Sequence, residues 1–349
     1  MKSNKARGNP VTILLVWPVV LFTLIVLISD CDSSLNPKQG NSAEFKGIRK
    51  SVSISVTGTP LNWLLIIAIE QGFFSGEGLD VTPKYYPSGK RSLLGMFAGE
   101  VDIASVADVP IVFQSFKRQD FSIFATIGSS DNDNKIVARK DRGIQKPEDL
   151  KGKRIATHES AAAHFFQYLF LLKNGLLEKE VEVSFMKAEK LPGALVRGEV
   201  DAITTREPFF SEVRELLGDT AVVFADRGLY SKAFHQVAFK NFIRENPEII
   251  RRVLRAMLQA EEFVRNDSGQ AIKILSSKLE ISEDKIAAVL PELNLKVQLS
   301  QLCLLRFDDE ARWVLKKKWA DGPEIPNYLN FVYLDALKAV KPERVTIIH

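Results

Sequence analysis

A short motif occurs twice in this chain, about a hundred residues apart, and it restricts the folds that the chain can adopt. Ala98-Gly99-Glu100-Val101-Asp102 returns as Arg197-Gly198-Glu199-Val200-Asp201, and an apolar stretch of helical period precedes each copy. A glycine directly after a helix supplies the left-handed residue that ends it, and the alternating residues that follow predict a short buried strand. Two copies of this unit predict two similar α/β lobes. The alternative is a chance recurrence of a connection that any α/β chain contains.

Strand and helix signals alternate through the middle of the chain. Segments of period two predict strands at Ser51–Val56, Leu79–Thr82, Ser122–Ile127, Lys135–Ala138 and Lys153–Ala156, besides the strand after each motif copy. Helical patterns separate them, which favours parallel sheets covered by helices. From Asn246-Pro247-Glu248 onward the pattern becomes helical, with a cap followed by proline at the first helical position. A length of 349 residues, 46% of them hydrophobic, suits two domains.

The N-terminus indicates export. Basic residues precede an uncharged apolar run from Val11 to Ile28, a pattern that keeps this end in the cytoplasm and sends the rest outward. Residues 1–31 are therefore predicted to be a signal peptide, a lipoprotein signal or a retained membrane anchor. Residues 32–48 are predicted to be a polar linker.

Cys31 bears on which of these alternatives holds. Ile28-Ser29-Asp30-Cys31 resembles a bacterial lipobox, in which the cysteine would carry the lipid, but Asp30 stands where a small residue is expected. Lipidation at Cys31 and simple cleavage both stay open. Cys303, the second cysteine, lies in an apolar run and is predicted to be a buried thiol.

Composition and motifs exclude several classes of function. The net charge of +4 is small, and no dense basic stripe with interleaved aromatics is present, so nucleic acid is not an expected partner. No phosphate-loop, H-E-x-x-H or paired C-x-x-C pattern occurs, and the four histidines lack ligand spacing. We expect no metal, no cofactor and no catalytic residue. Asp102 and Asp201 could look catalytic, but each directly follows a helix stop, so a structural role is preferred.

An ordered set of motifs carries a family resemblance from about Ser51 to the C-terminus. The set contains Gly72-Phe73-Phe74, Glu77-Gly78-Leu79-Asp80-Val81, Ser88-Gly89, both motif copies, Asp149-Leu150-Lys151-Gly152-Lys153 and Glu207-Pro208. It resembles the substrate-binding proteins of ABC importers for sulfonates, taurine, nitrate and thiamine-precursor pyrimidines. The resemblance implies a two-lobed α/β fold of the periplasmic-binding-protein type II class, with a small molecule held between the lobes.

The same resemblance implies how the chain is divided. Residues 49–131 and 236–349 would form lobe 1, residues 132–235 would form lobe 2, and Phe121–Ile127 and Val237–Phe239 would carry the crossovers. The expected partners are a small ligand, an ABC permease with its ATPase, and a membrane that tethers the N-terminus. The expected location is the periplasm or the outer face of the cytoplasmic membrane.

Turns that end strands and open helices supply the candidate site. Free backbone N–H groups and the positive helix end suit anions there, and Lys90 or Arg206 could add full charge. The predicted ligand-binding residues are Thr57, Gly58, Thr59, Ser88, Gly89, Lys90, Ser105, Asp108, Ser160, Ala161, Arg206 and Glu207. For Lys90 a solvated position, and for Arg206 a salt bridge to Glu207, are the alternatives. Family members commonly have Trp where Arg206 stands, so the ligand stays open.

Two functions of different classes remain. The preferred one is a non-catalytic receptor that captures a small, sulfonate-like or nitrate-like solute and delivers it to the permease. The alternative is an enzyme of thiamine-precursor or menaquinone-type biosynthesis on the same lobes, because fold alone does not separate the two. The export segment and the lack of a nucleophile or cofactor motif favour the receptor.

Overall fold

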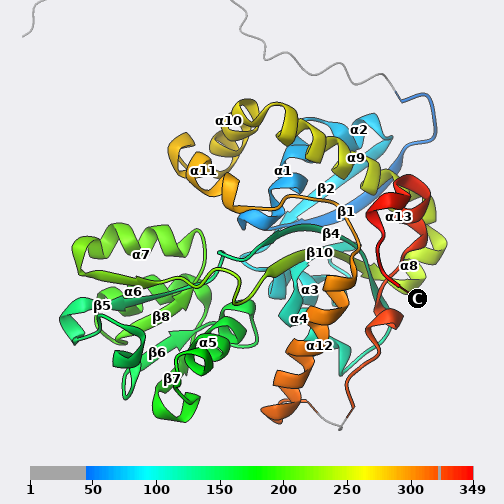
Figure 1. Cartoon of the computed structure of the whole chain (residues 1–349). Coiled ribbons are helices and arrows are strands. Elements are labelled where there is room, and N and C mark those ends of the chain that lie inside the picture. The colour runs from blue at the N-terminus through cyan, green and yellow to red at the C-terminus, as the bar shows by residue number, and fades with distance from the viewer. Residues whose placement is uncertain (1–44, 321–323, 349) are drawn as a thin grey trace, which may run out of the picture. The chain divides into compact units, whose positions relative to one another are not determined.

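The computed structural model describes residues 45–320 and 324–348, which fold into two five-stranded sheets with helices packed around each (Figure 1). The predicted export segment, Cys31 and most of the predicted linker lie outside the described residues. Within the described ranges, no helix combines the length and the apolar character needed to cross a membrane.

The two sheets share one topology. The first has the order β2-β1-β3-β10-β4 and the second β7-β6-β8-β5-β9. In each, three parallel strands are followed by an antiparallel strand and an edge strand. The strands of the first sheet are β1 (Lys50–Val56), β2 (Leu79–Tyr85), β3 (Ile103–Ala107), β4 (Phe121–Ser130) and β10 (Lys232–Phe239), and those of the second are β5 (Lys135–Arg139), β6 (Arg154–Thr157), β7 (Glu182–Phe185), β8 (Ala202–Thr205) and β9 (Ala221–Phe224).

Helices cover both sheets, and the C-terminal third is mainly helical, as predicted. Around the first sheet lie α1 (Trp63–Glu70), α2 (Phe73–Gly76), α3 (Gly89–Phe97), α4 (Asp108–Ser115), α8 (Lys240–Glu245), α9 (Pro247–Asn266), α10 (Ser268–Leu279), α11 (Glu283–Val289), α12 (Gln301–Lys316) and α13 (Asp335–Val340). Around the second lie α5 (Ala162–Lys173), α6 (Leu191–Val196) and α7 (Phe209–Leu217). The chain leaves the first sheet after β4 and returns to it at β10, so residues 131–134 and 225–231 connect the lobes.

The repeated motif occupies equivalent places in the two lobes. Gly99 follows α3 with φ +74° and Gly198 follows α6 with φ +72°, the left-handed conformation that glycine favours. The Asp102 carboxylate accepts hydrogen bonds from the N–H and Oγ of Ser53 in β1, at 2.8 and 2.6 Å. Asp201 accepts from the N–H of Arg154 in β6 at 3.0 Å and pairs with its guanidinium at 2.7 Å. The structural role predicted for both aspartates is confirmed.

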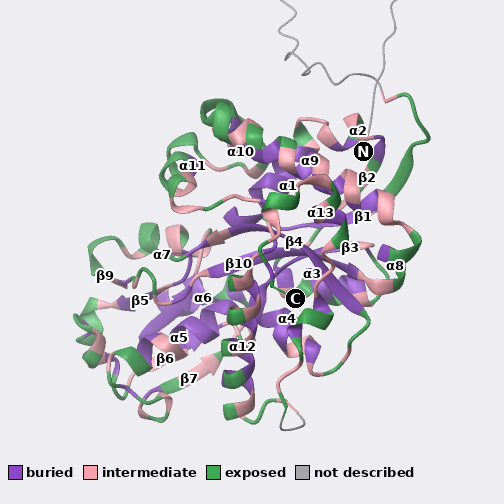
Figure 2. Cartoon of the chain, turned by 45° about the vertical axis from the view of Figure 1, so that its right-hand side comes forward, coloured by how far each residue is buried: buried purple, intermediate pink, exposed green. Residues whose placement is uncertain are grey.

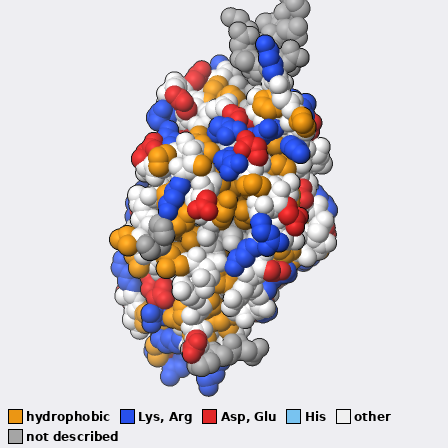
Figure 3. Space-filling model, turned by 90° about the vertical axis from the view of Figure 1, so that its right-hand side faces the viewer, with side chains coloured by type: hydrophobic (Ala, Val, Ile, Leu, Met, Phe, Trp, Pro, Cys, Tyr) orange, Lys and Arg blue, Asp and Glu red, His pale blue; other side chains and the backbone are white. Residues whose placement is uncertain are grey.

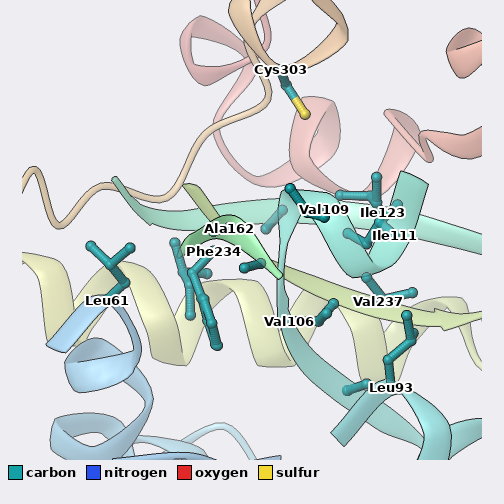
Figure 4. Packing of buried hydrophobic residues seen from close by; sticks show 14 of the residues in the cluster. Leu61, Leu93, Val106, Val109, Ile111, Ile123, Ala162, Phe234, Val237 and Cys303 are labelled. Atoms are coloured by element: carbon teal, nitrogen blue, oxygen red, sulfur yellow. The ribbon is translucent and has the colours of Figure 1, made fainter. Parts of the chain in front are cut away.

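Buried apolar side chains line both faces of the second sheet because neighbouring strand residues point to opposite sides. Ile136 and Ala138 join a core that continues into the first lobe, whereas Val137 packs with α6 and α7. Figure 2 shows the buried residues concentrated in the strands and the inner faces of the helices. On the face shown in Figure 3, basic and acidic side chains are interspersed with apolar ones. Cys303 is buried in the core, as predicted, and burial raises the pKa of its thiol to about 12 (Figure 4).

Besides the two connecting segments, a contact between helices α12 and α5 joins the lobes. Trp313 of α12 packs against His164 and Phe165 of α5, with ring centroids 5.0 and 5.1 Å apart. His164 is fully buried, and burial, with the nearby charge of Lys317, lowers its pKa to about 4. An uncharged aromatic contact therefore holds α5 against lobe 1.

Candidate ligand-binding site

Helix starts and strand ends from both lobes enclose a small cavity, here called the basic cavity. Its volume is about 40 Å³. It is lined by Ser88, Gly89, Lys90, Ala107, Pro110, Lys232 and Phe234 of lobe 1 and by His158, Ala161, Ala162, Ala163, Ala188, Leu191, Thr204, Thr205 and Arg206 of lobe 2. Figure 4 shows Phe234 and Ala162 beside one another. On this measure a water molecule needs roughly 10 to 15 Å³, so a solute larger than a few water molecules requires the lobes to move apart.

Two helices begin at this cavity. Ser88 caps α3, its Oγ accepting the N–H of Arg91 at 3.4 Å, and Gly89 comes next. A Cβ on Gly89 would lie 3.0 Å from Cα of Val106 and 3.1 Å from the ring of Phe234, so only glycine fits without displacement. α5 begins at Ala162 with no side-chain cap. The first N–H groups of a helix lack partners within it, and they carry its positive dipole end, so this start suits an anion.

The charged side chains of the basic cavity are all cationic. Lys90 donates from Nζ to the carbonyl oxygen of Glu159 at 3.1 Å, across the lobes. Arg206 donates from Nη1 to the carbonyl oxygen of Glu207 at 2.7 Å. Lys232 pairs with Asp133 at 2.6 Å. Burial, followed by the charges of Lys90 and Arg206, lowers the pKa of His158 to about 4, so this imidazole is neutral near pH 7.

One lining residue of the basic cavity carries a buried hydroxyl without a partner. Thr205 Oγ1, at the end of β8, has no hydrogen-bond partner within the described residues. Buried polar groups in folded proteins are nearly always hydrogen-bonded, so this hydroxyl is available to a polar group in the cavity.

A second, larger opening lies between the lobes and is here called the acidic chamber. It adjoins the basic cavity in sequence, because Arg206 lines the cavity and Glu207 lines the chamber. Its volume is about 330 Å³. It is lined by Gly58, Pro60, Trp63, Glu280, Ile281, Ser282, Lys285, Ile286 and Val289 of lobe 1 and by Glu207, Pro208, Ser211, Glu212 and Glu215 of lobe 2. Lys285 pairs with Glu215 at 2.8 Å across the lobes, and the Glu207 carboxylate accepts from Oγ of Ser211 at 2.9 Å. The uncompensated charge is negative.

The structure brings some of the predicted ligand-binding residues together. Ser88, Gly89, Lys90, Ala161 and Arg206 line the basic cavity. Gly58 and Glu207 line the acidic chamber instead. Thr57 and Thr59 are buried at the end of β1 with unpartnered hydroxyls, and Ser160 lies in a small neighbouring pocket beside Lys90.

Ser105 and Asp108 do not reach either opening. The Ser105 hydroxyl donates to the carbonyl oxygen of Ser55 at 3.1 Å and accepts from Nε2 of Gln236 at 2.8 Å. Asp108 bonds to Nε2 of His235 at 2.8 Å. Both side chains are fully buried, so the structure gives them a role in holding lobe 1 together rather than in contacting ligand.

Asp108, His235 and Thr126 form a chain that superficially matches an acid-imidazole-hydroxyl triad. Thr126 Oγ1 lies 3.0 Å from His235 Nδ1, opposite the Asp108 contact. None of the three lines the basic cavity or the acidic chamber, and His235 is fully buried. A nucleophile must reach its substrate, so this chain is structural in the conformation observed. Among the described residues, no cluster of three His, Cys, Asp or Glu side chains could hold a metal ion.

Sequence reasoning missed Lys232, His158, Phe234, Leu191, Thr204 and Thr205 as lining residues. His158 and Thr205 adjoin predicted residues, so a wider window around each turn would have included them. Lys232 carries no local signal, because a lysine before an apolar strand usually lies on a solvated edge.

The fold is the two-lobed α/β fold of the periplasmic-binding-protein type. The alkanesulfonate-binding protein SsuA of Xanthomonas axonopodis pv. citri, solved with MOPS bound, superposes with a TM-score of 0.72 at 18% identity, over 82% of this chain and 99% of that one. The desulfurization enzyme DSZB has the same fold, with a TM-score of 0.62 at 14% identity over 84% of this chain and 99% of DSZB.

Sequence comparison gives the family. Residues 62–271 match the model of the family described as NMT1/THI5 like, and the chain belongs to that family. A Bacillus subtilis (strain 168) protein provisionally named an aliphatic sulfonates-binding protein is 26% identical over 277 residues, 78% of this chain and 81% of that protein. The taurine-binding periplasmic protein of Escherichia coli (strain K12) is 23% identical over 195 residues, 54% of this chain and 59% of that protein. The family resemblance found in the sequence is confirmed.

Proposed function

We propose that this protein is the extracytoplasmic solute-binding component of an ABC importer and that it captures a small organic anion of the sulfonate type between its lobes. The observation that carries the proposal is the charge of the basic cavity, whose ionised lining side chains are Lys90, Arg206 and Lys232. They line the same cavity as the starts of α3 and α5, where an anion gains both full charges and backbone N–H donors. Names of relatives that bind sulfonates or taurine support the same ligand class.

The walls of the cavity suit an organic rather than a purely inorganic anion. Apart from the cations and hydroxyls, the lining consists of small or apolar side chains, among them Ala161, Ala188, Leu191 and Phe234. Mostly apolar walls with a few convergent polar groups are typical of sites for small organic molecules. A sulfonate group on a short apolar chain satisfies both parts of this lining.

Titration calorimetry on the full-length protein in mild detergent tests the ligand class. Butanesulfonate and taurine are expected to bind, whereas a neutral pyrimidine is not; nitrate is the inorganic comparison. A thermal shift provides an independent readout, because ligand at a hundred times its Kd stabilises the folded state by about 2.7 kcal/mol. Tight binding of the uncharged pyrimidine, with no binding of any anion, would refute the proposal.

Delivery to a permease requires the protein to be held outside the cytoplasm. We propose that the segment before Ser33 tethers it to the outer face of the cytoplasmic membrane, through the apolar run or a lipid on Cys31. Fractionation should place the full chain in the membrane pellet and a chain beginning at Ser42 in the soluble fraction. Recovery of the full chain from the cytosol would contradict this.

An enzyme is the second candidate because DSZB, a desulfurization enzyme, has this fold. The two functions are separated by incubating the protein with butanesulfonate and following the solute by mass spectrometry. A receptor returns it unchanged, whereas consumption at a rate above that of buffer alone would favour an enzyme.

A further inference from the structure

One buried ion pair connects the first segment that joins the lobes to the strand that follows the second. Asp133 lies in the first connecting segment, between β4 and β5, and Lys232 begins β10, where the chain returns to lobe 1. Lys232 Nζ lies 2.6 Å from Asp133 Oδ2, and each side chain is 2% exposed. Their positions are 99 residues apart in the sequence, so the pair fastens the first connecting segment to the start of β10.

Lys232 also lines the basic cavity, and its ammonium is incompletely satisfied. An ammonium has three N–H donors, and within the described residues its hydrogen bond goes to Asp133 alone. Leaving buried charged donors without acceptors is costly, more so than for neutral groups. A ligand with several acceptor oxygens would supply what Lys232 lacks.

The other two cations of the cavity are held differently. Lys90 and Arg206 are each partly exposed, and each donates to a backbone carbonyl oxygen rather than to a carboxylate. Water can satisfy their remaining donors when the lobes are apart. Lys232, buried within the hinge, has less access to water, so it depends more on a ligand.

We propose that Lys232 is the principal charge anchor for the bound anion, and that Asp133 is a positioning residue that holds the Lys232 ammonium in the cavity and so links anion capture to the hinge. This inference rests on the proposed function, because it assumes an anionic solute. It also assigns specificity, since a neutral molecule of the same shape would leave the buried ammonium as unsatisfied as before.

Charged groups around Lys232 determine how it titrates. Burial lowers the pKa of Lys232, the Asp133 carboxylate acts in the opposite direction, Arg206 lowers the pKa further, and Asp108 raises it. Asp133 is therefore the group that keeps Lys232 protonated. Without it, the ammonium should lose its proton at a lower pH, and anion binding should weaken as the pH rises.

Calorimetry of butanesulfonate binding to four full-length variants tests this. Lys232→Met should weaken binding about a hundredfold, because one partner of a buried charge contact is removed. Lys135→Met is the matched control, since this neighbouring hinge lysine bonds to the carbonyl oxygen of Asn132, packs 4.8 Å from the ring centroid of Phe210 and lines neither opening. It should bind as the wild type does.

The Asp133→Asn variant tests whether Asp133 acts by keeping the Lys232 ammonium charged and in place, or only by filling space beside it. Its affinity for butanesulfonate should fall as the pH is raised from 6 to 9, while that of the wild type stays constant. Should a single variant fail to fold, Lys232→Met combined with Asp133→Asn removes both charges, which buried pairs often tolerate. The double variant should melt cooperatively and still bind weakly.

The outcomes are distinguishable. Wild-type affinity in a folded Lys232→Met protein, or in the double variant, would overturn the anchor while leaving the proposed function intact. An Asp133→Asn affinity without pH dependence would overturn the positioning role. Failure of the wild type to bind butanesulfonate or any anion would instead contradict the proposed function.

Discussion

The basic cavity and the acidic chamber lie between the same two lobes, yet their linings carry opposite charge. Arg206 and Glu207 are consecutive residues, and one lines the basic cavity while the other lines the acidic chamber. The acidic chamber is several times larger than the basic cavity, and helix starts line both openings, since Trp63 begins α1, Pro208 precedes α7 and Ser282 precedes α11. Charge, rather than size, therefore separates the two openings as candidates for an anion, because the larger one would repel it.

Neutralising Arg206 and Glu207 one at a time should give the largest difference between the two openings. Arg206→Ala should weaken butanesulfonate binding about tenfold, less than the loss of Lys232, since it removes a cation that is partly exposed and bonds to a backbone carbonyl oxygen. Glu207→Gln should change the affinity less than threefold, because its carboxylate lies in the acidic chamber and bonds to Ser211. Titration calorimetry of both proteins measures the difference. Equal losses would show that the two openings act as one site.

A second test adds one methyl group to a glycine of each opening. Gly89→Ala should destabilise the protein by about 2 kcal/mol, because the new Cβ would meet Val106 and Phe234 at the wall of the basic cavity. Gly58→Ala in the acidic chamber meets nothing within 4 Å and should stay within about 0.5 kcal/mol of the wild type. Urea unfolding gives both values. An unchanged midpoint for Gly89→Ala would mean that α3 shifts without cost.

Lys285→Ala should have a smaller effect. The Lys285–Glu215 pair bridges the lobes beside the acidic chamber, but the two side chains are 53% and 70% exposed. Ion pairs this exposed contribute little to stability, so the urea midpoint should hardly move. A clear drop in the midpoint would assign this side of the cleft a larger part in holding the lobes together.

The smallest expected effect is that of pH on wild-type affinity. His158 has a pKa of about 4 in the folded protein, below its usual value, so it stays neutral from pH 6 to 8 and the charge of the basic cavity does not change. Butanesulfonate affinity should vary less than twofold over that range. As the pH falls toward 4, protonation adds a positive charge, and affinity should rise while the fold persists. A decrease in affinity on acidification would place another titrating group in the site.

The residues that could be predicted from sequence are those whose signal is local. The repeated Gly-Glu-Val-Asp motif predicts the turns at Gly99 and Gly198 and the positions of Asp102 and Asp201. The alternation of apolar residues predicts β1 and β6. The helix starts at Ser88 and Ala161 also follow from local turn residues, and both line the basic cavity.

Contacts between distant segments could not be predicted in this way. Lys232 reaches the cavity because Asp133, in the first connecting segment, holds it there, and no pattern within either segment records that pairing. Asp108 is among the residues predicted to bind ligand, but its carboxylate bonds to His235 from β10, which lies 127 residues away in the sequence. The acidic chamber combines α7 with α10 and α11, a juxtaposition that only the tertiary fold creates.

The contact of Trp313 with α5 has an optical consequence. The same helix that presents Ala161 and Ala162 to the cavity rests, one turn later, on an indole ring of the other lobe. Separation of the lobes along this side would admit water to that ring and move its emission to longer wavelength. The molecule thus contains a built-in fluorophore at the contact that opening must disturb, and its conformation can be followed without any attached label.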